Sequence, residues 1–416
     1  MDEIKKAIIL AGTFDTKGEE YQYVKALFDE LELATILIDT SGRPSGMEAD
    51  ISAEKVAELA GYNLDQLRAE NDRGVMVKAM MEGLQILVPY LYEKGTVAGM
   101  LGLGGSGGTS LLAPAMRTLP WGVPKIMVST MAGGNVSHYV GTSDLIMFPS
   151  IADISGLNKI TRFVLRSAVQ AMAGMLGCTK TLAPDQYPDK PRIAATMYGV
   201  TTPAVTFARK LLEDNGFEVI VFHASGTGGR VMEQLIDAGA FCGVLDLTTT
   251  EWCDELFGGI MAAGQDRSEA ASRNHIPQVV SVGAMDMVTF GPPETVPSKY
   301  ADRKKHAHNP MVTIMRTNVE ENTALGHKLA EKINRAQEYT VLLLPLKGVS
   351  AVDAEGKVFW GPEEDKALFD TLKEKVAVNR IPVIELDCNI NDEEFGEAAA
   401  VILMEMIFHK YRPEGQ

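Results

Sequence analysis

Four short segments in the first half of the chain combine glycine with hydroxyl-bearing and charged side chains. Each comes directly after a run of apolar residues. Glycine lets the backbone approach a phosphate group closely, and a helix that starts there offers unpaired N–H groups to an anion. The pattern therefore predicts a phosphate-bearing ligand. The residues expected to contact it are Thr13, Asp15 and Lys17 in the first segment, Thr40 in the second, Gly104, Gly105, Ser106, Gly107 and Gly108 in the third, and Thr130 and Gly133 in the fourth.

The third segment has two interpretations. Gly102–Gly107 matches the spacing G-x-G-x-x-G, which is a weak signal when it stands alone. No acidic residue follows a strand about 20 residues later, as dinucleotide recognition requires. No Lys-Ser or Lys-Thr pair follows the glycines, as a Walker A loop requires. A tight turn that lets a helix pack closely is the alternative, but four such segments in one half of the chain favour a ligand.

Asp144 follows the fourth segment and precedes another apolar run. Its carboxylate is the kind of hard oxygen ligand that Mg²⁺ prefers, so it could hold a metal ion that screens the phosphates. The alternative is an aspartate that caps a helix or stabilises a turn.

A second group of anion-binding residues occurs after residue 220. The segment from His223 to Arg230 follows an apolar run and opens a helix, and Arg230 could bind a carboxylate or phosphate with two parallel hydrogen bonds. We expect it to hold a small polar or acidic molecule. The residues expected to bind that molecule are Ser225, Gly226, Gly228, Gly229 and Arg230, together with Asn309 from a later segment.

Five residues are candidates for catalysis in the second half. Asp246, Glu251 and Arg316 lie at or just after apolar runs, and His306 and His308 lie in the Pro-rich, basic segment 291–310. Such a long irregular segment is usually functional or mobile. The histidines could bind a metal ion with an acidic residue, act in acid–base chemistry, or have no chemical role.

The elements that must position these residues repeat along the chain. Short runs of Val, Ile and Leu alternate with helical stretches, which is typical of a parallel sheet covered on both faces. The rhythm lapses where three prolines and several charges occur, and it then restarts. We therefore predict an α/β protein with two doubly wound, mostly parallel-sheet (Rossmann-like) lobes. The expected boundaries are 1–180 for the first lobe, 181–191 for a linker and 192–416 for the second lobe.

Composition excludes several classes of protein. The chain has 416 residues, and 39 Lys+Arg against 55 Asp+Glu give a formal net charge of −16. That charge argues against a partner that is a nucleic acid or an anionic membrane. The 4 cysteines show no C-x-x-C pair, and we find no signal peptide and no apolar stretch near the roughly 20 residues that span a bilayer. We expect a cytoplasmic protein.

Seven motifs resemble one known family. They are GTFDTKGEEYQYVK, GLGGSGGTS, STMAGGNVSHYVGTSD, HASGTGGRVMEQLI, LDLTTTE, HAHNPMVTIMRTN and PLKGVSAVD, and they extend from Gly12 to Asp353. Together they resemble the family that includes the inhibitory N-terminal domain of a tomato mosaic virus resistance protein. The resemblance implies a two-lobed α/β homodimer that holds ATP in its first lobe. The implied ATP contacts are the phosphate-site residues given above with Met131, Ala132 and Asp144.

These observations lead to one expected function and two alternatives. The first is an ATP-binding protein, an enzyme acting on a small polar or acidic metabolite bound in the second lobe. The second is a non-catalytic, nucleotide-responsive dimer that binds or regulates a partner. The third is a metal-assisted isomerase or lyase that uses Asp246, His306 and His308.

Overall fold

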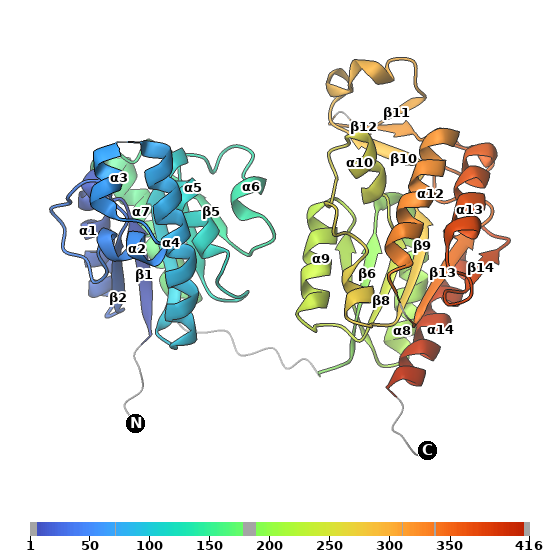
Figure 1. Ribbon diagram of the computed structural model, residues 1–416, viewed down its shortest axis with the longest axis horizontal. Helices are drawn as coiled ribbons and strands as arrows, with labels where there is room; N and C mark the ends of the chain where they lie inside the picture. Colours follow the sequence, from blue (N-terminus) through green and yellow to red (C-terminus); the bar gives the residue numbers. More distant parts are fainter. Residues whose placement is uncertain (1–5, 71, 178–188, 310, 337, 412–416) are drawn as a thin grey trace. The chain divides into compact units, whose positions relative to one another are not determined.

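The computed structural model consists of two α/β units, residues 1–185 and 186–416 (Figure 1). It describes residues 6–70, 72–177, 189–309, 311–336 and 338–411. Residues 181–188 of the predicted linker lie outside that part of the chain.

The first unit is built on a parallel sheet. Its strands are β1 (Ala7–Gly12), β2 (Thr35–Asp39), β3 (Val97–Gly104), β4 (Lys125–Ser129) and β5 (Ile146–Pro149). They lie in the order β2-β1-β3-β4-β5. All residues of β1 and β4 are buried, because helices cover both faces of the sheet.

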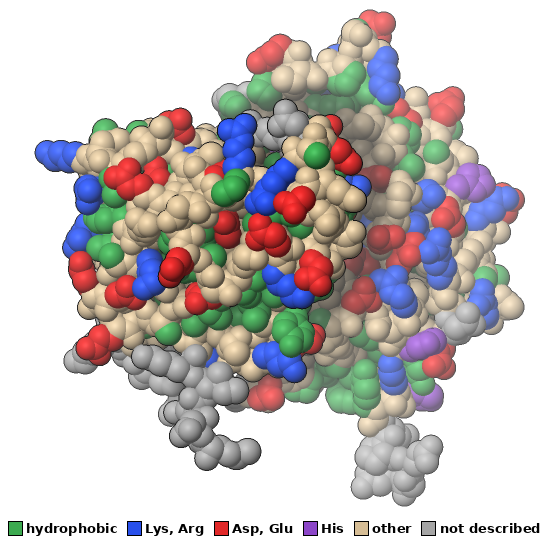
Figure 2. Space-filling view, turned by 60° about the vertical axis from the view of Figure 1, so that its left-hand side comes forward, with side chains coloured by type: hydrophobic (Ala, Val, Ile, Leu, Met, Phe, Trp, Pro, Cys, Tyr) green, Lys and Arg blue, Asp and Glu red, His purple; other side chains and the backbone are tan. Residues whose placement is uncertain are grey.

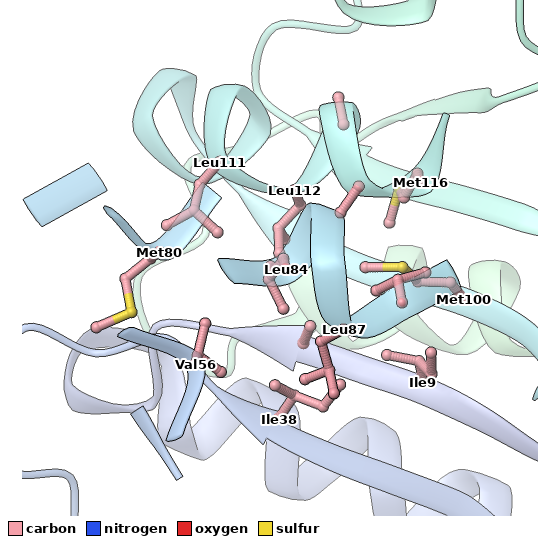
Figure 3. Packing of buried hydrophobic residues seen from close by; sticks show 14 of the residues in the cluster. Ile9, Ile38, Val56, Met80, Leu84, Leu87, Met100, Leu111, Leu112 and Met116 are labelled. Atoms are coloured by element: carbon pink, nitrogen blue, oxygen red, sulfur yellow. The ribbon is translucent and has the colours of Figure 1, made fainter. Parts of the chain in front are cut away.

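Alternate side chains of each strand face different helices. The helices of this unit are α1 (Phe14–Glu30), α2 (Ala53–Leu59), α3 (Leu64–Glu70), α4 (Arg73–Glu93), α5 (Ser106–Met116), α6 (Ser137–Val140) and α7 (Lys159–Met175). Ile8 and Leu10 pack in a core with α1 and α7. Ile9 packs with α2 to α5 on the other face, where Leu84, Leu112 and Met116 fill the layer (Figure 3).

Polar side chains fix where two of these helices begin. The Asp72 carboxylate accepts hydrogen bonds from the N–H groups of Gly74 (2.7 Å) and Val75 (3.1 Å) at the start of α4. Asn158 and Thr161 form a reciprocal capping box at the start of α7.

The second unit repeats this plan with six parallel strands. They are β6 (Arg192–Met197), β7 (Glu218–His223), β8 (Gly243–Thr248), β9 (Gln278–Gly283), β13 (Thr340–Pro345) and β14 (Val383–Leu386), in the order β14-β13-β9-β8-β6-β7. The helices are α8 (Thr202–Asp214), α9 (Thr227–Asp237), α10 (Glu251–Phe257), α11 (Ala270–Arg273), α12 (Val319–Ile333), α13 (Pro362–Lys375) and α14 (Glu393–Lys410). Helices α8 and α14 pack on one face of the sheet, and α9 to α13 pack on the other.

A small antiparallel sheet departs from the predicted pattern. It contains β10 (Met287–Phe290), β11 (Lys305–Asn309) and β12 (Val312–Arg316), in the order β10-β12-β11. The apolar run at 312–315 is therefore a strand of this sheet and not of the main parallel sheet. The expectation of a wholly irregular segment over 291–310 was wrong, because its last residues pair with β12.

The predicted α/β class with two parallel sheets is confirmed. In the described residues, no helix combines the length and the apolar character needed to span a membrane. Figure 2 shows basic and acidic side chains intermingled over the face that it presents.

Candidate functional site

The residues predicted to bind phosphate lie around the point where the strand order of the first sheet reverses. β1 and β3 are neighbours, but the chain continues from β1 to β2 on one side and from β3 to β4 on the other. In open parallel sheets, ligands bind beyond the carboxyl ends of the strands at such a point. Thr13, Thr40, Gly105 and Thr130 each follow the carboxyl end of a strand of this sheet.

The N-terminus of α5 presents backbone N–H groups at this edge. The helix starts after Gly105, which provides no side-chain cap. Among the described residues, no acceptor is found for the N–H groups of Ser106, Gly107 and Gly108, and all three residues are at least partly exposed. Unpaired amides and the helix dipole together favour an anion there.

The first turn of α1 offers fewer free N–H groups to an anion. Its amides are already bonded: the Asp15 N–H donates to Ser41 Oγ (2.9 Å), and the N–H groups of Thr16 and Lys17 donate to the Thr13 carbonyl (3.2 and 2.9 Å). Two polar atoms nearby remain unpaired. Asp15 Oδ1 and Thr40 Oγ1 are buried and have no hydrogen-bond partner in the described part of the chain. Buried polar atoms normally have partners, so these two are available to a bound molecule.

A hollow of about 410 Å³ adjoins the start of α5. Thr130 connects the two features, because it lines the hollow while its N–H donates to the Gly104 carbonyl (3.2 Å). Its Oγ1 also lies 3.6 Å from the place that a Cβ on Gly105 would take. The remaining lining residues come from the ends of β4 and β5 and the turn after β5, and are Ser129, Gly133, Pro149, Ser150, Ile151, Ala152 and Asp153.

Lys17 is hydrogen-bonded to the segment that follows the lining residues of this hollow. Its Nζ donates a hydrogen bond to the carbonyl of Ile154 (2.5 Å), the residue after the lining residue Asp153. The predicted Lys17 charge thus lies on the same edge as the glycine-rich turn.

Tyr21 holds the two central strands apart at this edge. Its hydroxyl donates to the Ala11 carbonyl (2.5 Å) and accepts from the Leu103 N–H (2.9 Å), so it bridges β1 and β3 where their direct pairing ends. Burial raises the pKa of this phenol above its ordinary value. A Cβ on Gly12 would lie 2.1 Å from the Tyr21 hydroxyl, which explains the glycine at this position.

Asp144 does not belong to this group. It precedes β5, and its Oδ1 pairs with the Nζ of Lys125 (2.6 Å), the first residue of β4. Since β4 and β5 are parallel, both residues lie at the amino edge of the sheet, opposite the residues predicted to bind phosphate. Although partial burial opposes it, the hydrogen bond and charge of Lys125 lower the pKa of Asp144. The structural alternative, a turn-stabilising aspartate, describes it better than the predicted Mg²⁺ ligand.

In the second unit, a carboxylate of the protein already fills the predicted anion site. Glu251 Oε1 accepts hydrogen bonds from the N–H groups of Gly226 (2.6 Å) and Gly229 (3.2 Å) at the start of α9. A Cβ on Gly229 would lie 2.2 Å from Glu251 Oε2, so that glycine is needed for the carboxylate to fit. Ser225 and Gly228 lie in the same turn, and exposed Arg230 bonds weakly to Thr227 Oγ1 (3.4 Å).

Arg267 organises this region, although no motif in the sequence marks it. Its guanidinium, 1% exposed, lies 2.6 Å from both oxygens of Asp246, 2.6 Å from Glu251 and 3.3 Å from Glu233. Asp246 Oδ1 also accepts from Thr196 Oγ1 (2.8 Å). Asp246 and Glu251, which were candidates for catalysis, therefore form a buried structural network.

Arg316 lies in a second buried cluster, at the carboxyl ends of β9 and β13. Its Nη2 is 2.7 Å from Asp365 and 3.5 Å from Asp353, and its Nη1 is 3.5 Å from the carbonyl of Asp286. Burial, and next the charge of Asp353, raise the pKa of Asp286 to about 7 and that of Asp365 to about 8. Hydrophobic residues around this edge, such as Phe359, enclose the cluster.

The histidine segment gives no metal site in the described residues. His306 is exposed on β11, opposite Ile314 of β12. His308 and Asn309 continue the strand, but their side chains lie outside the described part of the structure. No group of three His, Cys, Asp or Glu side chains suited to a metal ion occurs in the residues that the structure describes.

The fold and the sites define a class and a family. Two doubly wound parallel sheets, each with a reversal of strand order, make this a two-unit α/β protein of the Rossmann-like class. Residues 6–181 match the N-terminal domain, and residues 190–407 the C-terminal domain, of the uncharacterised protein family UPF0261. The chain belongs to this family.

Relatives cover nearly all of the chain. A UPF0261 protein of Clostridium tetani is 49% identical over 405 residues, which are 97% of this chain and 100% of that protein. A UPF0261 protein of Rhizobium meliloti is 44% identical over 95% of this chain and 97% of the relative. The ToMV resistance protein Tm-1(GCR237) of Solanum lycopersicum is 44% identical over 96% of this chain but only 55% of its own length.

Proposed function

We propose that the first unit binds a nucleoside triphosphate, with ATP as the first candidate, through the N-terminus of α5. The observation that supports this most is the row of three amides at Ser106, Gly107 and Gly108, which have no acceptor among the residues that the structure describes and lie beside a hollow at the reversal of strand order. A volume of about 410 Å³ suits a small molecule better than a macromolecule.

Two further features fit a polyphosphate. Lys17 supplies a positive charge at the same edge, where its Nζ donates to the neutral Ile154 carbonyl and forms no ion pair with a carboxylate among the described residues. Thr40 Oγ1 is buried without a hydrogen-bond partner in the described part of the chain, and it lies beyond the end of β2, next to the reversal point. As a hydroxyl group it can donate to a phosphate oxygen.

Substitution of Ser106 tests this proposal. Ser106 is exposed in the first turn of α5, so Ser106→Asp adds a carboxylate that the helix dipole stabilises by about 0.3–1 kcal/mol. The same charge repels phosphate. We expect at least a tenfold higher Kd, about 1.4 kcal/mol, for both ATP and tripolyphosphate in isothermal titration, with no loss of thermal stability.

Two variants serve as controls. Ser106→Asn keeps a similar size without the charge, and Ser110→Asp adds the charge one turn further along α5, where the residue is also exposed. Both should keep affinities near that of the wild type. Equal binding of tripolyphosphate to Ser106→Asp and wild type would contradict the proposal.

We propose a nucleotide-responsive binding role in preference to an enzyme acting on an acidic metabolite. The turn expected to bind that metabolite holds Glu251, and Asp246 is saturated by Arg267 and Thr196. ATP should therefore stabilise the full chain without ADP formation across a panel of small organic acids. ATP consumption that rises with one added acid would contradict this role.

A further inference from the structure

The turn after β5 holds an isoleucine in a costly backbone conformation. Ile151 has φ = +64°, in the left-handed region that β-branched residues rarely adopt. Such a residue costs on the order of 1–3 kcal/mol and persists only where its surroundings impose the conformation.

Hydrogen bonds on both sides impose this conformation. The Ser150 N–H donates to the Ser129 carbonyl of β4 (3.2 Å), which ties the turn to the sheet. The Ser150 hydroxyl and the Ala152 N–H then close the turn, each with a bond of 2.7 Å. A glycine at position 151 would adopt the same backbone without the cost.

The isoleucine side chain does not pack in the hydrophobic core. Ile151 is 74% exposed, yet it lines the hollow with Pro149 and Ala152. The strained conformation thus places an apolar side chain at the hollow and does not improve packing within the protein.

We infer that this turn forms the apolar wall of a subsite for the heterocyclic base of the ligand, with Ile151 as its principal contact. The inference rests on the proposed function, since phosphates at the start of α5 direct the rest of the molecule into the adjoining hollow. Thr130 marks the polar side next to Gly105, and Pro149, Ile151 and Ala152 form an apolar side. A planar base buries its face against such a wall, whereas a bare polyphosphate does not reach it.

Ile151→Gly tests the inference because stability and affinity should change in opposite directions. Relief of the left-handed strain should keep or raise the thermal stability of the unliganded full chain. Loss of the apolar wall should raise the Kd for ATP about tenfold, or about 1.4 kcal/mol. The Kd for tripolyphosphate should not change.

Two further variants separate contact from backbone effects. Ile151→Val keeps the strain and most of the wall, so its affinity for ATP should stay within about threefold of wild type. Glu32→Gly relieves a similar strain at φ = +57°, at an exposed site after α1, and should leave ATP binding unchanged.

The outcomes distinguish this inference from the proposed function. If wild type binds ATP and tripolyphosphate but Ile151→Gly binds both as tightly as wild type, the base subsite is wrong and the phosphate site stands. Equal losses for ATP and tripolyphosphate would also overturn the base subsite. If wild type binds neither molecule, the proposed function fails and the subsite with it.

Discussion

Tyr21 shows how one hydroxyl group can set the spacing of two strands. It stands in for a direct hydrogen bond between β1 and β3 and leaves the ends of both strands apart at the point where the ligand is expected. We therefore regard Tyr21 as a positioning residue for the turn at Gly105.

Removal of this hydroxyl should affect both stability and binding. Tyr21→Phe leaves the Ala11 carbonyl and the Leu103 N–H buried without this partner, which costs about 1–3 kcal/mol. ATP affinity should fall as well, because the turn shifts. Denaturant unfolding and titration with ATP measure the two effects.

Tyr62→Phe is the matched control in the same unit. Its hydroxyl donates to Glu82 Oε2 (3.2 Å) in a partly exposed site, so its loss should cost less than about 1 kcal/mol. If Tyr21→Phe is as stable as Tyr62→Phe and binds ATP normally, the positioning role is refuted.

The buried carboxyl group of Asp254 makes the stability of the protein depend on pH. Burial raises the pKa of Asp254 to about 7, and the residue is 1% exposed. The folded protein then holds a proton that the unfolded chain releases near pH 4, so this group's stabilisation is complete below about pH 4 and is lost as the pH rises through about 7. Asp286 changes stability in the same direction.

Asp254→Asn should remove part of this pH dependence. The amide stays neutral at every pH, so the free energy of unfolding should fall less between pH 5 and pH 8 than in wild type, by about 1.4 kcal/mol for each pH unit between pH 5 and the folded-state pKa of about 7. Urea unfolding at several pH values measures it. Asp370→Asn, at an exposed residue paired with Lys366, should leave the slope intact, and a wild-type slope in Asp254→Asn would contradict the prediction.

At the scale of elements, Arg267 joins β8, α9 and α10 through three carboxylates. Removing one partner of a buried ionic network leaves uncompensated charges. Arg267→Met should therefore destabilise the second unit by about 3–5 kcal/mol.

An exposed arginine provides the comparison. Arg273 pairs with Asp237 at the surface (2.7 Å), and Arg273→Met should cost at most about 1 kcal/mol. Similar denaturant midpoints for the two variants would show that the Arg267 network does not stabilise the fold.

The elements also show how far the sequence could predict the site. The sequence indicates the turn at 104–108, because consecutive small residues after an apolar run are typical of a backbone that must stay accessible, and ligand binding there stays a prediction. The similar turn at 225–230 carries the same sequence signal, but no local pattern reveals that Glu251, some 20 residues later, supplies the anion. Arg267 lies in a polar segment without a motif, and only the long-range contacts of the fold give it a role.

Strand order sets the same limit. Runs of Val, Ile and Leu were enough to predict two parallel sheets, because strands buried on both faces must be continuously apolar. They could not predict that 312–315 pairs antiparallel with β10, nor that Asp144 lies at the amino edge, because both depend on which strands become neighbours.

For the whole molecule, contacts divide the chain into two units, each with its own core. Calorimetry of the full chain should then show two transitions, and ATP should raise only the one that belongs to the first unit. At 100 times the Kd the gain is about 2.7 kcal/mol. Arg267→Met should lower the other transition, which identifies it. A single transition would contradict the prediction that the two units unfold independently. A transition whose midpoint is changed both by ATP and by Arg267→Met would also contradict it.

A crystal structure of the full chain with a non-hydrolysable ATP analogue would show directly where the phosphates bind. We predict phosphate oxygens within about 3.2 Å of the backbone nitrogens of Ser106, Gly107 and Gly108, with the base against Ile151. Phosphates bound anywhere else, such as the turn at 225–230, would contradict the account.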